Sequence, residues 1–207
     1  MNSNLAAQPI TLADVIQLTY QSGGDWAICH ALRLLKLIQD IGQDIPYDET
    51  ALTLAAYLHD WGAFPRYQIP GVEHASRSRQ IVEKEIFPYM ELPSEVKEIA
   101  MEAIELHDYR DARPLRSNES LLLREADMLE FLGAVGTARE FAWGPNNLGI
   151  SRQRILSRRD GIQGRFTLPR AQEMARSRQE RMNLILGWLE EEGFEILSRP
   201  SPLERSD

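Results

Sequence analysis

The chain has 207 residues, of which 43% are hydrophobic and 26% are charged, and its formal net charge is −8. This length suits one well-buried domain, and the composition excludes a largely disordered protein. The acidic balance disfavours broad binding to nucleic acids or anionic membranes, because both need a basic face. We therefore expect no nucleic-acid and no membrane partner, whereas a small phosphorylated substrate needs only a local cluster of cations.

The chain also lacks the sequence signals of a secreted or membrane protein. No apolar run approaches the roughly 18–20 residues of a membrane-spanning helix, and the first residues lack the basic and apolar regions of a secretion signal. The single cysteine, Cys29, cannot form an intramolecular disulfide, and we expect a buried thiol rather than a metal ligand. These features favour a cytoplasmic protein.

Hydrophobic residues recur at helical spacing along most of the chain, and no segment alternates as a strand does. We predict an all-α fold with a flexible N-terminus (1–10), a single domain with a C-terminal helix (11–197) and a disordered tail (198–207). Weak periodicity predicts a partly ordered excursion over 144–167. The predicted helices span about 11–20, 26–40, 50–60, 73–87, 94–107, 121–130 and 169–192.

Several helix ends carry recognisable signals. Thr11 and Asp14 have the spacing of a capping box, and Gly23-Gly24 is expected to end the first helix before Asp25 caps the next. The last helix, increasingly apolar toward its end, should pack across the bundle or against a second subunit. That leaves a homo-oligomer open.

The most informative stretch is Leu58-His59-Asp60-Trp61-Gly62, which ends a strongly apolar helical segment. A histidine beside an aspartate in such surroundings is costly unless something pairs with both side chains. A metal ion is a common partner for this combination. The same reasoning applies to Asp127, whose carboxylate lies in an apolar helix.

The chain has four histidines, and for three of them an ordinary structural role is an alternative to metal binding. His30 could be a core histidine bonded to a backbone carbonyl, and His74 could face solvent in the first turn of its helix. His107 could act as a favourable charge at the C-terminus of its helix.

Taken in order, His30, His59-Asp60, His74, His107 and Asp127 resemble the ligand order of the HD superfamily of metal-dependent phosphohydrolases. The segment 125–139 is similar to the pattern A-D-x-L-D-x-x-G-A-x-G-x-A-R of one bacterial branch. The resemblance covers about half of the chain and implies an all-α, HD-domain helical bundle. It also implies one metal ion held by His30, His59, Asp60 and Asp127, and leaves open a second held by His74 and His107, with Asp60 bridging.

Imidazole and carboxylate ligands favour Mn, Fe, Co, Ni or Zn over Ca. Such an ion lowers the pKa of bound water toward about 7 and polarises a phosphoryl oxygen, while Asp60, our candidate catalytic residue, could orient that water or accept its proton. The resemblance implies a phosphate ester or anhydride substrate, most naturally a nucleotide. Candidate phosphate ligands, each of which could instead be a surface or structural arginine, are Arg33, Arg66, Arg77 and Arg139.

One position departs from the family pattern. Several family members carry a glutamate three residues after the His-Asp pair as a general acid or water-positioning group, and this chain has Ala63 there. Either Glu73, Glu130 or a metal-bound water replaces it, or the reaction differs. Two alternatives therefore stay open: an HD-fold di-iron oxygenase and a non-catalytic metal-binding sensor module.

Overall fold

The computed structural model describes residues 9–144 and 147–193, and within these ranges the fold is all-α, as predicted. The chain divides into two compact units, residues 1–127 and 128–207. The flexible N-terminus predicted for 1–10 lies almost wholly outside the described residues, and the tail predicted for 198–207 lies entirely outside them. The single domain over 11–197 stays a prediction.

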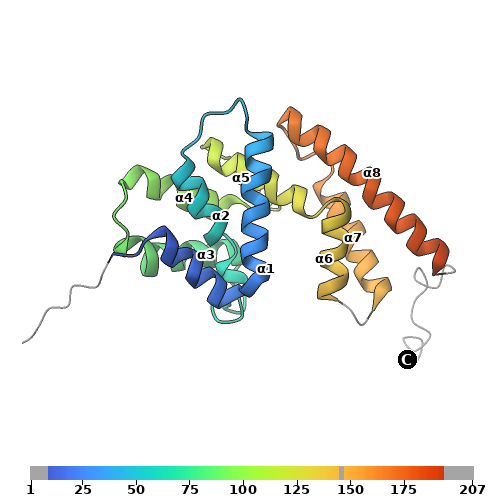
Figure 1. Ribbon diagram of the computed structural model, residues 1–207, viewed down its shortest axis with the longest axis horizontal. Helices are drawn as coiled ribbons and strands as arrows, with labels where there is room; N and C mark the ends of the chain where they lie inside the picture. Colours follow the sequence, from blue (N-terminus) through green and yellow to red (C-terminus); the bar gives the residue numbers. More distant parts are fainter. Residues whose placement is uncertain (1–8, 145–146, 194–207) are drawn as a thin grey trace, which may run out of the picture. The chain divides into compact units, whose positions relative to one another are not determined.

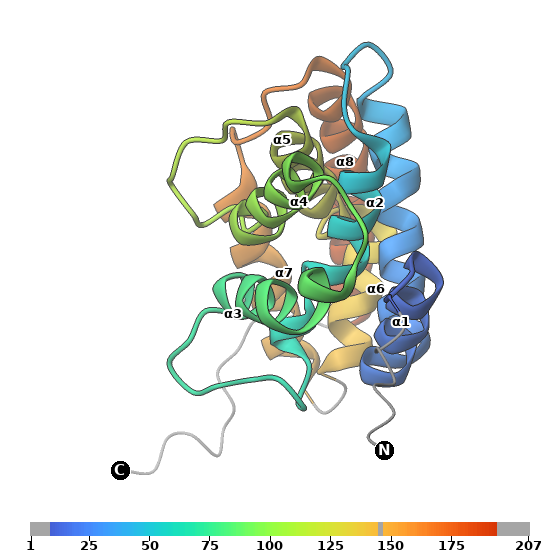
Figure 2. The same ribbon diagram turned by 90° about the vertical axis from the view of Figure 1, so that its left-hand side faces the viewer.

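The first unit is built from helices that pack as a bundle (Figure 1). Helix α1 contacts α2, α2 contacts α4, and α3 contacts both α4 and the turn η1. The two long connections of this unit lead into α3 and α5 (Figure 2). Its elements are α1 (Leu12–Ile41), α2 (Glu49–Leu58), η1 (Trp61–Ala63), α3 (His74–Ile81), the π-turn η2 (Val82–Ile86), η3 (Phe87–Tyr89), α4 (Ser94–Leu106) and α5 (Asn118–Glu130), whose last residues belong to the second unit.

Local signals set the ends of these helices. Thr11 and Asp14 form the predicted capping box, in which the Thr11 hydroxyl accepts from the Asp14 amide and the Asp14 carboxylate from the Thr11 amide. Helix α1 is interrupted at Gly24, whose φ of 63° lies in the left-handed region that glycine adopts without a Cβ penalty. This confirms the predicted break between two helical segments. Asp48 caps α2 by accepting from the Ala51 amide.

Helix α2 is largely buried, and it leads directly into the predicted site. Every residue from Leu54 to Leu58 is buried, so the helix delivers its C-terminal His59 into the core. The next turn, η1, is anchored to α1, because the buried indole of Trp61 donates a hydrogen bond to the Thr19 hydroxyl at 3.0 Å. The apolar run thus fixes the position of the His-Asp dipeptide.

The second unit contains α6 (Gly133–Trp143), α7 (Leu148–Ile162) and α8 (Pro169–Glu192), and α6 contacts the other two. The predicted excursion over 144–167 is wrong, because most of it forms α7. Its apolar stripe is thin, since Ser151, Ile155 and Ile162 are its buried residues and most others are polar. Two arginines of α7, Arg154 and Arg158, form ion pairs with the buried carboxylate of Glu140 in α6.

Two smaller expectations concern exposure and membranes. Cys29 is exposed rather than buried, because it points away from the core-facing stripe that contains Ala27 and Ala31. Among the described residues, no helix is both long and apolar enough to cross a membrane.

Candidate metal centre

His59 and His107 are oriented by the helices that carry them. Each follows the last residue of its helix, α2 or α4, and each Nδ1 lies near the carbonyl oxygen three residues earlier, 3.0 Å for Ala56 and 2.7 Å for Ile104. A carbonyl oxygen only accepts, so Nδ1 carries the proton in both rings and Nε2 presents its lone pair. Helix geometry therefore selects the tautomer that a metal ligand needs.

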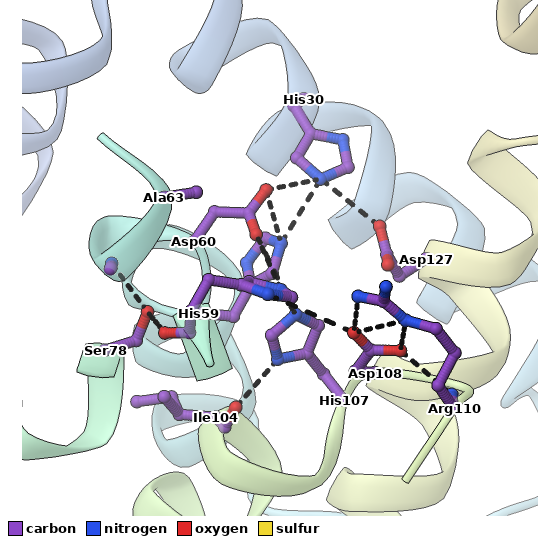
Figure 3. Close-up of polar contacts among 12 residues, drawn as sticks. His30, His59, Asp60, Ala63, Ser78, Ile104, His107, Asp108, Arg110 and Asp127 are labelled. Atoms are coloured by element: carbon purple, nitrogen blue, oxygen red, sulfur yellow. Dashed lines mark hydrogen bonds and ion pairs between the residues drawn. The ribbon is translucent and has the colours of Figure 1, made fainter. Parts of the chain in front are cut away.

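Asp60 lies between two pairs of histidines, of which His30, His59 and His107 are labelled in Figure 3. Its Oδ2 is 3.3 Å from Nε2 of His59 and 3.7 Å from Nε2 of His30. Its Oδ1 is 3.7 Å from Nε2 of His74 and 3.8 Å from Nε2 of His107. We call His30 and His59 the inner pair and His74 and His107 the outer pair. The carboxylate has one oxygen directed to each pair.

Within each pair the two Nε2 atoms face one another, at 3.2 Å in the inner pair and 3.1 Å in the outer pair. The ligating atoms of each pair and Asp60 all lie within 4.8 Å of one another. Lone pairs and carboxylate oxygens are acceptors, and acceptors that converge in a buried space require a shared cation or protons. Imidazoles with a carboxylate fit a divalent transition metal.

Asp127 adds a second carboxylate to the inner pair, with Oδ1 3.4 Å from Nε2 of His30. Burial opposes its ionisation, but a hydrogen bond and the charge of His30 outweigh burial and lower the pKa of this carboxyl. For Asp60, burial is likewise outweighed by His59, His30 and His107, which hold its pKa well below the ordinary value. Burial and the neighbouring His59 lower the pKa of His107 to about 4, so its imidazole is neutral near pH 7.

The model of the HD domain family matches residues 27–132 of the chain, which include all six residues of this cluster. The chain belongs to the HD domain family. A comparison with curated protein sequences finds no match for this HD protein.

Solved structures share the fold at low sequence identity. A predicted HD superfamily hydrolase from an uncultured Thermotogales bacterium is 23% identical, with a TM-score of 0.59, over 89% of this chain and 92% of the other. YpgQ of Bacillus subtilis in complex with ADP is 21% identical, with a TM-score of 0.63, over 88% and 97%. An HD-superfamily hydrolase from Bacillus thuringiensis is 19% identical, with a TM-score of 0.59, over 87% and 96%.

The four candidate arginines differ in their surroundings. Arg33 lies half-buried on α1, one turn after His30. Arg66 is exposed in the loop after η1 and lies over the Tyr67 ring at 5.3 Å, while Arg77 donates from Nε to the Tyr67 carbonyl at 2.9 Å. In the second unit, Arg139 pairs with the buried carboxylate of Glu130 at 3.3 Å. Their contact with a substrate stays a prediction.

The structure places Ala63 and the two glutamates that could replace the missing acid in different surroundings. Ala63 lies in η1 on the side of Asp60, where its methyl group offers no proton (Figure 3). Glu73 is exposed and directly precedes α3. Glu130 is buried and forms an ion pair with Arg139.

The sequence interpretation missed Asp108, which follows His107. Its Oδ2 lies 4.0 Å from Nδ1 of His74, and it also forms an ion pair with Arg110 (Figure 3). Burial opposes ionisation of Asp108, but hydrogen bonds from Arg110 outweigh it and lower the pKa to about 2. The signal that could have revealed it is the repeat Asp-x-Arg-Asp-x-Arg at 108–113.

Asp108 also lies on the wall of a cavity of about 420 Å³ in the first unit. Charged side chains dominate this wall, and His74 beside it is 25% exposed. The cavity therefore lies next to the outer pair rather than the inner one. Its polar lining residues are Glu73, Ser76, Glu105, Asp108, Arg110, Asp111 and Arg113.

Proposed function

We propose that this HD domain protein is a metal-dependent phosphohydrolase that cleaves a phosphate ester or anhydride, with nucleotides as its substrate class. The observation that carries the proposal is the division of the Asp60 carboxylate between the inner and outer histidine pairs. A bridging carboxylate between two imidazole pairs is typical of sites that hold two metal ions for hydrolysis. The ADP complex of YpgQ, a relative in fold, supports the nucleotide class.

The chain supplies two overlapping sets of ligands. His30, His59, Asp60 and Asp127 would hold the inner ion, and Asp60, His74 and His107 would hold the outer one. The donors suit Mn, Fe, Co, Ni or Zn. Bound there, the ions would supply Lewis acidity toward a phosphoryl oxygen and toward water.

The remaining steps fall to the protein's own side chains. Asp60 would orient the attacking water with its carboxylate, which makes it the catalytic residue of the proposal. Arg33, Arg66 and Arg77 are the first-unit candidates for holding the phosphate charge, because guanidinium groups bind phosphate oxygens in a bidentate manner. Burial of the inner pair, at 2% exposure for each imidazole, keeps bulk water from competing for the ligands.

A second function is favoured by a specific observation. The two three-residue ligand groups share Asp60, and Ala63 occupies the position where several members of the family carry a glutamate. A dinuclear iron centre that activates oxygen fits the same ligands and needs no such acid. Oxygen uptake with an organic substrate, together with a visible iron chromophore, would favour this reaction over hydrolysis.

The deciding experiment begins with elemental analysis of protein purified without chelator, beside the His59→Ala variant. A phosphate-release screen over nucleotides with Mn, Co, Ni, Mg and Fe follows. Bound metal that the variant loses, together with metal-dependent phosphate release, would support the phosphohydrolase. A protein without metal that no added ion activates would contradict it.

A further inference from the structure

We propose that Asp108, held in place by Arg110, is a positioning residue that orients His74 and thereby sets the affinity of the outer pair for its metal ion. The inference rests on the metal binding proposed above, and it concerns a residue that lies outside both ligand groups. It begins with a difference between His74 and the other histidines.

His74 lacks the two restraints that fix His59 and His107. Those two imidazoles end their helices, donate from Nδ1 to a carbonyl of the preceding turn, and are 2% and 1% exposed. His74 is the first residue of α3, so no preceding turn of helix offers a carbonyl to its ring. Its side chain is 25% exposed. Neither burial nor a backbone hydrogen bond holds this ring.

Asp108 is the polar partner that Nδ1 of His74 does have, with Oδ2 at 4.0 Å. This distance is longer than a direct hydrogen bond, so the contact is an electrostatic one that a single water can bridge. Asp108 also lines the cavity of about 420 Å³, so water can reach its carboxylate. The carboxylate favours a proton on Nδ1, which leaves the Nε2 lone pair facing Asp60 and His107.

Arg110 makes this carboxylate a fixed partner rather than a mobile one. Its backbone amide donates to Asp108 Oδ1 at 2.8 Å, and its Nε lies 3.0 and 3.1 Å from the two carboxylate oxygens. A third donor, Nη2, contacts Oδ2. The planar fork therefore restrains the rotation of the carboxylate, and the restraint passes from Arg110 through Asp108 to His74.

The chain provides a matched control three residues later. Arg113 binds Asp111 in the same manner, with its backbone amide at 2.9 Å, Nε at 3.1 and 3.0 Å, and Nη2 at 2.6 Å. Among the contacts of the described residues, Asp111 has none with a histidine. The two Asp-x-Arg pairs thus share local geometry; Asp108 is the one that contacts His74, whereas Arg113 of the other pair also binds Glu105.

The experiment is a metal titration of the full chain, stripped of metal, with Mn²⁺ by calorimetry and with Co²⁺ by its visible absorption. Wild type should bind two equivalents. Asp108→Ala should weaken the second equivalent about 10–100-fold and leave the first unchanged, which is the usual range for loss of a residue that orients a ligand. Asp108→Asn, whose amide oxygen can still accept a hydrogen bond from a bridging water but carries no charge, should recover part of the affinity, and Asp111→Ala should match wild type.

The outcomes separate this inference from the function on which it rests. A wild-type protein that binds no metal would overturn both. Two equivalents in wild type with an unchanged second affinity in Asp108→Ala would overturn the positioning role alone. An equal loss in Asp108→Ala and Asp111→Ala would also overturn it, because the effect would then come from the folding of the loop.

Discussion

The inner and outer histidine pairs share one carboxylate but are held by the fold in different ways. His30 and His59 are both 2% exposed, and Asp127 adds a second carboxylate beside His30. In the outer pair His107 is equally buried, but His74 is 25% exposed and begins a helix that follows a long loop. The fold therefore organises the inner pair before any ion binds and leaves one outer ligand adjustable.

This difference has a consequence for metal affinity. Ligands fixed by packing lose little conformational freedom when an ion binds, whereas a partly exposed side chain loses rotamer freedom at that moment. The inner pair, with four candidate ligands, should hold its ion more tightly than the outer pair, with three. The two pairs should accordingly behave as a tight site and an exchangeable site.

The largest expected effect comes from Asp60, because both pairs depend on it. Asp60→Ala should lose both ions and lower phosphate release by about a thousandfold, since Lewis acidity contributes several kcal/mol and each 1.36 kcal/mol is about tenfold in rate. Elemental analysis and a phosphate assay test this, with circular dichroism as the check on folding. Asp40→Ala is the control, because Asp40 makes a surface pair with Lys36 at 3.0 Å. Metal retained by Asp60→Ala would contradict the bridging role.

A comparison of His59→Ala with His74→Ala tests the ranking of the two pairs directly. His74→Ala should keep one tightly bound equivalent, because the inner ligands stay intact. His59→Ala should lose the tight equivalent and with it the activity. The metal-to-protein ratio after exhaustive dialysis distinguishes the variants, and a tight equivalent that survives in His59→Ala but not in His74→Ala would reverse the ranking.

Stepwise removal of metal by a chelator should show the same order. The outer ion should leave first with a small drop in melting temperature, and the inner ion later with a larger one. An ion at 100 times its Kd stabilises the folded state by about 2.7 kcal/mol, so the tighter site makes the larger contribution. Calorimetric melting at rising chelator concentration measures both steps. A single cooperative loss of two ions would argue against separate sites.

The sequence predicted the features that depend on local pattern. The helical class, the Thr11 cap, the break at Gly24 and the helix over 169–192 follow from periodicity and from known start and stop signals, and the structure confirms them. The arginine-rich α7 was not predicted because its apolar stripe is thin, while its arginines pair with Glu140 of α6. Hydrophobic periodicity contains little information about such a helix.

The six candidate ligands were predicted from the order of histidines and aspartates along the chain. The structure brings their side chains into one cluster. The order of the ligands in the sequence does not predict the side from which each imidazole ring approaches Asp60. That depends on how α1 packs against α2 and how α3 packs against α4, which joins residues distant in sequence. Asp108 was missed for the same reason, since its neighbour His74 lies 34 positions earlier in the sequence.

Gly62 provides a smaller perturbation that should act on the outer pair. A Cβ at this position would lie 2.2 Å from the His74 carbonyl oxygen and 2.7 Å from the Ser78 amide, so Gly62→Ala must push α3 away from η1. Overpacking of this kind costs about 1–3 kcal/mol. We expect weaker binding of the second equivalent with the first nearly unchanged. Gly187→Ala, where a Cβ meets nothing within 4 Å, is the control.

Of the substitutions considered, Ser78→Ala should have the smallest effect on metal binding by the outer pair. Its buried hydroxyl accepts from the Gly62 amide at 2.8 Å and donates to the His74 carbonyl at 2.9 Å (Figure 3). Ser78→Ala leaves the Gly62 amide unsatisfied, which should lower the free energy of unfolding by about 1–3 kcal/mol.

The Ser78 hydroxyl restrains the backbone of His74 rather than its imidazole, so the affinity of the second equivalent should fall only a few-fold, by roughly 1 kcal/mol or less. Denaturant unfolding and the Mn²⁺ titration measure the two quantities separately. Ser76→Ala, on the cavity wall, should change stability by no more than about 0.5 kcal/mol. A loss in Ser78→Ala as large as that in Asp108→Ala would show that the backbone of α3, and not the orientation of the ring, sets the affinity of the outer pair.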